Sequence, residues 1–364
     1  MSTSYTVSTV QKIVNKIFKN LHGHQKKTLS AIVLGAIRNN TGRLTDMARG
    51  MVSMTTIKHR VKRVGRFLGN KNILIEEQAS VFLRFLLSWQ GTLERPVIFM
   101  DWTQEHGQNV LMLSLKYKKR SIPIYWVSVK DGELLRSRNS TENTAVRLLK
   151  MWMGEQKFIL ICDRGFSRSS LYRELLRSGI YFIIRIPKST HILCKEYEGA
   201  LADVMLHQDK VRDFSRATFL GADAKQPMRV IVKKAKIGGH WTTWYLATNI
   251  FDSRKTQIIN HYKRRMGCEA TFRDLKTTFG WRKQIGIGDP TRLSRYLFIL
   301  TVALIVSILT AGRKIAQKYK HMVSLTKSWR GTQVVSDVQL GIWLIQRLSD
   351  HLTSFHPRKY GAGA

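Results

Sequence analysis

The order of apolar segments from residue 95 onward is the feature that most narrows the fold of this chain. Short apolar runs that suit β-strands alternate there with amphipathic stretches that suit helices. Strand candidates occupy 97–100, 110–117, 120–128, 158–162 and 181–186, and helix candidates occupy 141–153 and 169–177. Three strands are thus followed by alternating helices and strands, which predicts an α/β domain built on a mixed sheet.

This order is that of the ribonuclease H-like fold, a mixed sheet flanked by helices. Two aspartates follow strands within it, Asp101 after 97–100 and Asp163 after 158–162. Open α/β sheets place their sites at the carboxyl ends of strands, and these two strands can lie side by side. Taken singly, Asp101 could simply terminate its strand and Asp163 could be a turn or capping residue.

A third acid, Glu269, lies in a stretch with helical spacing. At about 100° per residue, Tyr262, Arg265, Glu269 and Lys276 fall within roughly 60° of one another and form one polar stripe. An apolar seam beside the stripe begins at Cys268 and would dock this helix on the sheet. Docking by the seam turns the stripe toward the edge where the two aspartates emerge.

The charge of the chain bounds its partners. The sequence has 61 Lys and Arg against 24 Asp and Glu, a formal net charge of +37. A polyanion is the natural partner of such a chain, and counterion release from phosphates would provide much of the affinity. A basic ribosome-associated protein and a membrane-surface protein remain the alternatives on charge alone.

The first 90 residues are basic and helical in pattern. A short helix at 44–51, a turn at 52–54 and a longer helix at 55–68 with Thr55 as N-cap predict a helix-turn-helix, whose second helix would enter a DNA major groove. One face of that helix is apolar, at Ile57, Val61, Val64 and Leu68, and the rest is basic, at Lys58, Arg60, Lys62, Arg63 and Arg66. A solvated basic helix with no groove to read is the alternative.

Neither a membrane span nor secretion is predicted. The apolar stretch 296–311 is shorter than the about 18 to 20 residues that a span needs and contains Thr301, Ser307 and Thr310, so we expect a buried core helix. The N-terminus lacks the pattern of a signal peptide, and the three cysteines have neither disulfide nor metal-ligand spacing. These features predict a cytoplasmic protein.

Two motifs carry a resemblance to a known family. Tyr262, Arg265, Glu269 and Lys276 match the YREK signature of bacterial insertion-sequence DDE transposases of the cut-and-paste, hairpin-forming group. The run Asp163-Arg164-Gly165-Phe166 resembles the DRGF block around their second aspartate. The resemblance covers about 97–320, and the N-terminal region fits such a transposase only by composition.

The resemblance implies a chemistry. Asp101, Asp163 and Glu269 would hold two Mg²⁺ ions, with Mn²⁺ able to substitute and Asp101 bridging the pair. A water would cut at the transposon end, and the released 3′ hydroxyl would form a hairpin that is reopened before transfer into target DNA. The DNA phosphates would be held by Tyr262, Arg265 and Lys276.

A β-rich insertion is predicted between the second aspartate and Glu269, with strands at 217–220, 228–233 and 242–248. Trp241 lies 28 residues before Glu269, where the resemblance implies a tryptophan that stacks on a base flipped out of the duplex. Trp244 is the competing candidate, and either can be a core residue. Lys233, Lys234 and Lys236 would face DNA if this insertion lies along it.

The predicted domains are a helical DNA-binding domain at 1–90, a ribonuclease H-like core at 91–187 and 251–320, the β-rich insertion at 188–250, and a C-terminal helical region at 321–364. The implied partners are double-stranded DNA, as transposon ends and target, and a second copy in a synaptic homodimer, at the bacterial nucleoid. Two other functions stay open: a nuclease of the same fold without strand transfer, and a non-catalytic DNA-binding repressor derived from a transposase.

Overall fold

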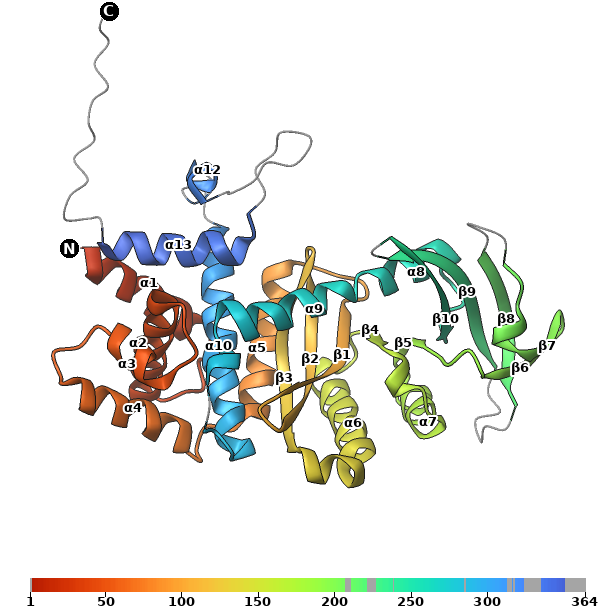
Figure 1. Cartoon of the computed structure of the whole chain (residues 1–364), viewed down its shortest axis with the longest axis horizontal. Helices are drawn as coiled ribbons and strands as arrows, with labels where there is room; N and C mark the ends of the chain where they lie inside the picture. The colour runs from red at the N-terminus through yellow and green to blue at the C-terminus, as the bar shows by residue number, and fades with distance from the viewer. Residues whose placement is uncertain are drawn as a thin grey trace, which may run out of the picture. The chain divides into compact units, whose positions relative to one another are not determined.

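The computed structural model describes residues 2–206, 211–220, 227–237, 239–284, 286–312, 316, 318–323 and 335–350. The chain divides into two compact units, one of residues 83–272 and one of residues 1–82 together with 273–364 (Figure 1). This division splits the predicted second part of the core, 251–320, in two. Residues 251–272 belong to the unit of 83–272, and residues 273–320 group with the N-terminal helices. DNA binding by residues 1–90 and a dimer contact by residues 321–364 stay predictions.

The unit of residues 83–272 is built on one ten-stranded sheet with the order β3-β2-β1-β4-β5-β10-β9-β8-β6-β7. β2 runs antiparallel to both β1 and β3, whereas β4 runs parallel to β1 and β5. The predicted mixed sheet and its order of elements are confirmed, in the strand arrangement of a ribonuclease H-like core. The strands are β1 Val97–Glu105, β2 Gln108–Tyr117, β3 Arg120–Lys130, β4 Ile159–Cys162, β5 Tyr181–Arg185, β6 His191–Cys194, β7 Tyr197–Ala200, β8 Val211–Phe219, β9 Met228–Ile237 and β10 His240–Thr248.

Helices cover this sheet. α6 (Asp131–Met153) packs on β2 and β3, and α7 (Ser169–Arg177) packs on β5 and α6. α6 begins ten residues before the predicted start at 141, and Asp131 and Glu133 in its first turn complement the helix dipole. α8 (Lys255–Lys263) and α9 (Met266–Arg273) follow the last strand, and α5 (Ile75–Gln90) precedes the first.

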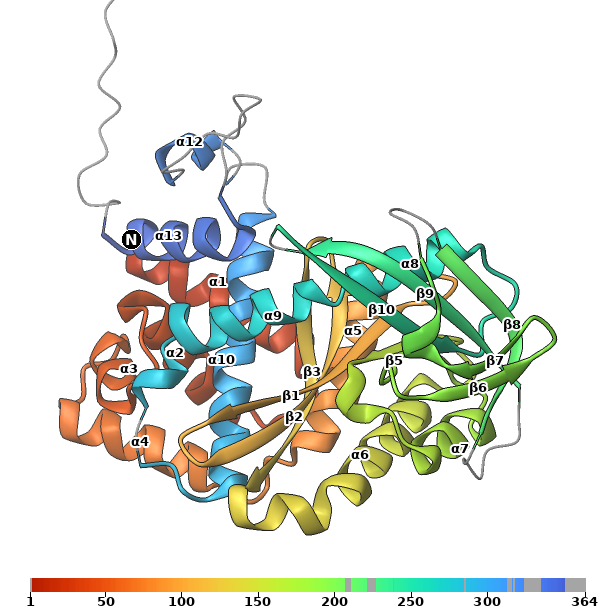
Figure 2. The same cartoon turned by 45° about the vertical axis from the view of Figure 1, so that its right-hand side comes forward.

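The β-rich insertion continues the core sheet instead of forming a separate one. β9 and β10 lie where strands were predicted, β8 begins six residues before the strand predicted at 217–220, and β6 and β7 add a hairpin at the far edge (Figure 2). β10 pairs antiparallel with β5, with Leu246 opposite Arg185. This pairing satisfies the backbone groups that β5 would otherwise expose as an edge strand.

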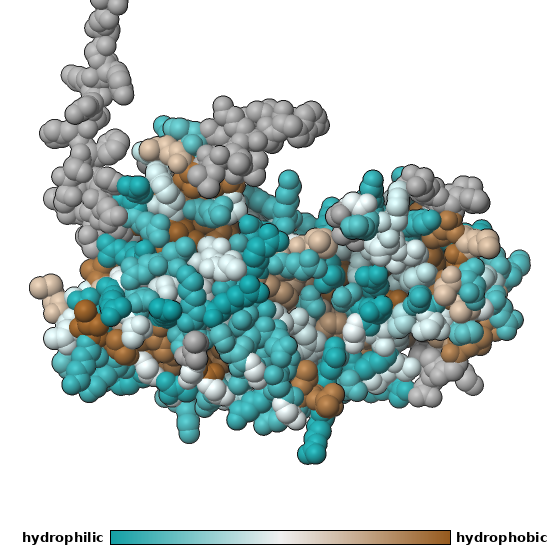
Figure 3. Space-filling view, viewed as in Figure 1, coloured by the Kyte–Doolittle hydropathy of each residue, from teal (hydrophilic) through white to brown (hydrophobic). Residues whose placement is uncertain are grey.

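The other unit is helical. Its elements are α1 Ser2–Ile17, α2 Gly23–Asn39, α3 Leu44–Gly50, α4 Ile57–Gly69, the π-helical η3 Asp274–Thr278, the 3₁₀ turn η4 Trp281–Lys283, α10 Pro290–Ala311, α12 Lys320–Val323 and α13 Asp337–Asp350. The predicted C-terminal region at 321–364 is described only in part, since 324–334 and 351–364 lie outside the described residues. The face of the molecule seen in Figure 3 is mainly hydrophilic, with small apolar areas.

α10 is the central helix of this unit and contacts α1, α2, α4 and α13. It is long and apolar enough to cross a membrane, but 89% of its most apolar window is buried inside the protein. The prediction of a buried core helix is therefore confirmed. Arg295 near its start is also buried and donates to the backbone carbonyls of Leu68 at 2.9 Å and Ile73 at 3.2 Å, which satisfies its charged group.

α3, a turn and α4 follow one another as the helix-turn-helix pattern predicted, with two differences. Thr56, and not Thr55, caps α4, and its side chain accepts from the backbone N–H of His59. Ile57 is 50% exposed, while Val64, Leu68 and also Phe67 are buried. The buried face of α4 is therefore shifted toward its C-terminal half.

Candidate active site

Asp101 and Asp163 emerge side by side from neighbouring parallel strands. The last residue pair between β1 and β4 is Met100 with Cys162, and each aspartate follows directly. β1 itself continues to Glu105 in its pairing with β2, so the prediction that the strand ends at Asp101 is wrong. What ends at Asp101 is the pairing with the short β4, and this leaves one side of β1 open for a site.

The residues around Glu269 do not form the single helix that their spacing predicted. α8 and α9 are separated by a turn at Arg264 and Arg265. Its backbone hydrogen bonds join residues three apart, from Gly267 N to Arg264 O at 2.9 Å and from Cys268 N to Arg265 O at 2.8 Å, and not four apart as in an α-helix. Three residues of the predicted polar stripe, Tyr262, Arg265 and Glu269, thus come from the end of α8, the turn and the first turn of α9.

Close packing holds α9 against the β2–β3 hairpin. The backbone N–H of Ser121 donates to Thr271 Oγ1 at 3.1 Å, and the Thr271 hydroxyl donates to Ser121 O at 2.8 Å. A Cβ atom on Gly267 would lie 3.1 Å from Lys119 O, so a residue without a side chain suits this approach. The contact fixes the first turn of α9, which carries Glu269, against the sheet.

Three carboxylates converge on one guanidinium in this arrangement. Arg265 Nη1 donates to Asp101 Oδ2 at 3.0 Å and Arg265 Nη2 donates to Glu269 Oε1 at 2.9 Å. The same Nη2 lies 4.0 Å from Asp163 Oδ2. Three acids that are far apart in the sequence therefore meet around Arg265, as predicted from the strand order and the stripe.

Tyr262 completes the cluster from α8. Its hydroxyl donates to Asp163 Oδ1 at 3.2 Å, and its ring meets Trp244 edge-on with 5.1 Å between ring centroids. The Asp163 side chain makes no helix-capping bond to η1 (Arg164–Phe166), so the capping interpretation of this residue is not supported. Both Tyr262 and Trp244 are buried, which fixes the phenol beside the carboxylate.

The cluster perturbs its own ionisation. Burial raises the pKa of Asp101 to about 6, the Arg265 charge opposes this rise, and the nearby Asp163 adds to it. Burial alone would lower the pKa of Arg265, but the charges of Asp101, Asp163 and Glu269 raise it above its usual range. Three carboxylates thus lie together where burial disfavours the charged form of Asp101, which is typical of functional sites.

The donor chemistry of the cluster fits a hard divalent cation. Its ligands are carboxylate oxygens, which Mg²⁺ and Mn²⁺ prefer. Among the described residues, no three His, Cys, Asp or Glu side chains are already arranged to hold a metal ion, and Arg265 lies among the three acids. The guanidinium supplies the positive charge among the three carboxylates in this arrangement.

Comparison with known proteins decides the family. The family described as "Transposase DDE domain" matches residues 94–305, more than half of the chain. This chain belongs to the DDE transposase family. Among solved structures, the piggyBac transposase in a synaptic complex with hairpin DNA is similar over 95% of this chain and 77% of that one, at 14% identity and a TM-score of 0.47. No curated protein matches the sequence.

The remaining predicted site residues of the transposase have different surroundings. Lys276 belongs to the helical unit, in η3, with its Nζ 5.8 Å from the ring centroid of Trp281. Trp241 on β10 is 42% exposed, whereas Trp244 is 5% exposed. Exposure separates the two candidates: Trp244 is a core residue, and of the two only Trp241 is open to solvent.

Two of the five side chains of α4 predicted to contact DNA, Arg60 and Arg63, instead make hydrogen bonds within the transposase itself. Arg60 donates to the carbonyls of Thr55 at 2.8 Å and Ser53 at 2.6 Å, and Arg63 donates to Thr28 Oγ1 at 3.1 Å. These guanidinium groups hold the turn before α4 and the contact with α2. The other three predicted contacts, Lys58, Lys62 and Arg66, are exposed.

The sequence did not indicate an open basic pocket in the helical unit, with a volume of ≈ 690 Å³. Its charged lining combines Lys62 and Arg66 of α4 with Arg292 from the first turn of α10. The only sequence signal was that Arg292 lies at the start of an apolar helix. The pocket extends the predicted phosphate contacts of α4 to a second helix.

Proposed function

We propose that this transposase cuts DNA at the ends of its own element, with divalent metal ions held by Asp101, Asp163 and Glu269, and joins those ends to target DNA. The convergence of the three carboxylates on Arg265 carries the proposal. In finer detail, we propose the bacterial insertion-sequence group with the YREK signature and a cut-and-paste pathway through a hairpin, acting on DNA in the cytoplasm as a synaptic homodimer.

The protein's part in the reaction is to orient acids and phosphates. Two Mg²⁺ ions, or Mn²⁺ in their place, would supply charge stabilisation for the attacking and leaving oxygens when bound. Tyr262 holds the Asp163 carboxylate in place through its hydroxyl. Asp101 is held by the backbone N–H of Trp102, which donates to its Oδ1 at 3.0 Å. Both aspartates are thus oriented before DNA arrives.

Arg265 has two roles in this proposal. Without DNA it neutralises the acids, and with DNA its planar group is free to bind a phosphate near the cut through two parallel hydrogen bonds. We expect Arg265→Lys to slow cleavage by about 10-fold to 100-fold, since the lysine keeps the charge but loses the fork, at about 1.5–3 kcal/mol per charged hydrogen bond. Single-turnover cleavage of labelled end DNA measures the effect, and a variant as fast as the wild type would contradict this role.

Trp241 is the proposed stacking residue for a flipped base. Its exposed side chain and its register opposite the positively charged Lys236 on β9 support this role. Because base stacking is worth about 1–3 kcal/mol, we expect Trp241→Ala to slow hairpin formation by about tenfold or more and first-strand nicking far less. Trp241→Phe, which keeps a ring, is the matched control and should retain most of the hairpin rate. Equal loss of both steps in the alanine variant would indicate a structural tryptophan.

Joining of ends to a target separates the proposal from its alternatives. Labelled DNA with the element's ends is incubated with the transposase, Mg²⁺ and a supercoiled plasmid, and the plasmid is probed for covalently attached label. Joined products support a transposase. Cuts without joining would indicate the nuclease, and binding without cuts would indicate the repressor.

A further inference from the structure

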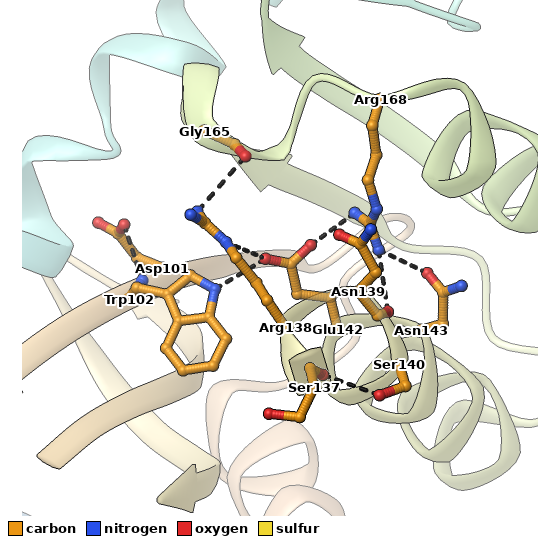
Figure 4. Close-up of polar contacts among 10 residues, drawn as sticks. All are labelled: Asp101, Trp102, Ser137, Arg138, Asn139, Ser140, Glu142, Asn143, Gly165 and Arg168. Carbon is orange, nitrogen blue, oxygen red and sulfur yellow. Dashed lines mark hydrogen bonds and ion pairs between the residues drawn. The ribbon is translucent and has the colours of Figure 1, made fainter. Parts of the chain in front are cut away.

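A buried glutamate lies beside the candidate active site without belonging to it. Glu142 of α6 is 1% exposed, and its two carboxylate oxygens accept three side-chain hydrogen bonds (Figure 4). Oε1 accepts from Trp102 Nε1 at 2.8 Å and from Arg138 Nε at 3.1 Å. Oε2 accepts from Arg168 Nη1 at 2.5 Å. A carboxylate so fully bonded to protein donors is not available as a ligand itself.

Two of the three donors to Glu142, Trp102 and Arg168, come from the segments that carry the two aspartates. Trp102 follows Asp101 in β1, and its backbone N–H bonds the Asp101 carboxylate. Arg168 ends the segment that begins at Asp163. One buried carboxylate therefore joins the strand of the first aspartate to the loop of the second.

Two arginines strengthen this link between α6 and the loop after Asp163. Arg138 reaches Gly165 O with Nη2 at 3.4 Å, and its guanidinium lies 6.0 Å from the Trp102 ring centroid (Figure 4). Arg168 Nη2 also donates to Asn143 Oδ1 at 2.7 Å. Trp102, Arg138 and Arg168 thus form with Glu142 one hydrogen-bonded group, which we call the Glu142 clamp.

The clamp acts beyond the last backbone pair between β1 and β4. Backbone pairing between β1 and β4 stops at Met100 and Cys162, so ladder bonds do not fix the spacing of the residues that follow. Burying a carboxylate between arginines carries a large desolvation cost, and an apolar contact would hold α6 on the sheet without that cost. Hydrogen bonds, unlike an apolar contact, restrain the direction of the Trp102 side chain and of the loop after Asp163.

We propose that Glu142 is a positioning residue that sets the placement of Asp101 and Asp163 for metal binding. The inference rests on the proposed function. Groups that orient metal ligands contribute to metal affinity even without touching the ion, and their loss commonly weakens binding about 10-fold to 100-fold. Glu142 would do so through Trp102 on one side and Arg168 on the other.

The test compares three variants of the full chain. Trp102→Phe removes only the indole donor, and Glu142→Gln removes the charge at nearly constant shape. Glu174→Gln is the matched control, because Arg147 and Glu174 join α6 to α7 by a two-bond ion pair of 3.0 and 3.1 Å without touching the clamp. Affinity of the free protein for Mn²⁺ is measured by electron paramagnetic resonance, and thermal unfolding and Mg²⁺-dependent cleavage are measured in parallel.

We expect both clamp variants to bind Mn²⁺ about tenfold more weakly or worse, to need correspondingly more Mg²⁺ for half-maximal cleavage, and to recover cleavage at high Mg²⁺. The Glu174→Gln variant should bind Mn²⁺ like the wild type. Should Glu142→Gln fail to fold, Trp102→Phe decides. Wild-type Mn²⁺ affinity in a folded clamp variant would overturn the inference, as would equal weakening in the control. The proposed function is judged separately, by metal-dependent cutting and joining in the wild type.

Discussion

Asp101→Ala, Asp163→Ala and Glu269→Ala will each reduce cleavage of transposon-end DNA by about a thousandfold or more. Each removes one of the three carboxylates that meet at Arg265, and metal assistance is worth several kcal/mol, at about 1.4 kcal/mol per tenfold. DNA binding will not weaken, because the lost charge repels phosphates. Single-turnover cleavage and gel-shift titration measure the two effects.

Asp213→Ala controls for the loss of any arginine-paired carboxylate. Asp213 of β8 binds Arg229 through two bonds of 2.9 and 2.7 Å, in the same sheet but outside the cluster. We expect this variant to cleave like the wild type once correctly folded protein is compared. A cluster variant that keeps its cleavage rate would remove that residue from the metal site.

Gly35→Ala will strongly destabilise the helical unit. A Cβ atom at this position would lie 2.0 Å from the carbonyl oxygen of Met47, a backbone atom of α3 that no rotamer change can move. Gly50 contributes to the same crossing, since its own Cβ would lie 2.6 Å from Gly35 O. Overpacking costs about 1–3 kcal/mol and sometimes more, so we expect about 2–3 kcal/mol and a clearly lower first unfolding transition in calorimetry.

Gly65→Ala is the matched control for that prediction. Gly65 lies inside α4, and a Cβ there would meet nothing within 4 Å. Replacing glycine with alanine in an open helical position should stabilise by about 0.4–1 kcal/mol. Equal unfolding temperatures of the Gly35 and Gly65 variants would show that α2 and α3 do not cross as closely as the structure has them.

The fold was predictable where local pattern and tertiary structure agree. Alternating apolar runs gave the strands of the mixed sheet, and α7 has the predicted bounds, Ser169–Arg177. The two aspartates were predictable as neighbours because parallel strands of one sheet end at the same edge. Trp241 and Trp244, by contrast, could not be separated by sequence, since both lie on one strand and it is tertiary packing, of Trp244 on Tyr262, that buries one and leaves the other exposed.

What the sequence did not show depends on contacts between distant segments. The turn at Arg264 and Arg265 interrupts a stretch with good helical spacing, so periodicity alone extends the helix through it. Arg60 has the pattern of a free basic residue but caps the carbonyls of the preceding turn. Glu142 is an isolated acid in the sequence, and only the approach of Trp102 and Arg168 gives it a role.

The most direct test of metal-dependent DNA cleavage at this site is a wild-type reaction followed on a denaturing gel. Labelled duplex that carries the element's end is incubated with the protein in Mg²⁺, in EDTA, and in EDTA followed by excess Mg²⁺. We predict a nick at the end and then a hairpin in Mg²⁺, neither product in EDTA, and both once Mg²⁺ is restored. Cleavage that persists in EDTA would contradict a metal site at Asp101, Asp163 and Glu269.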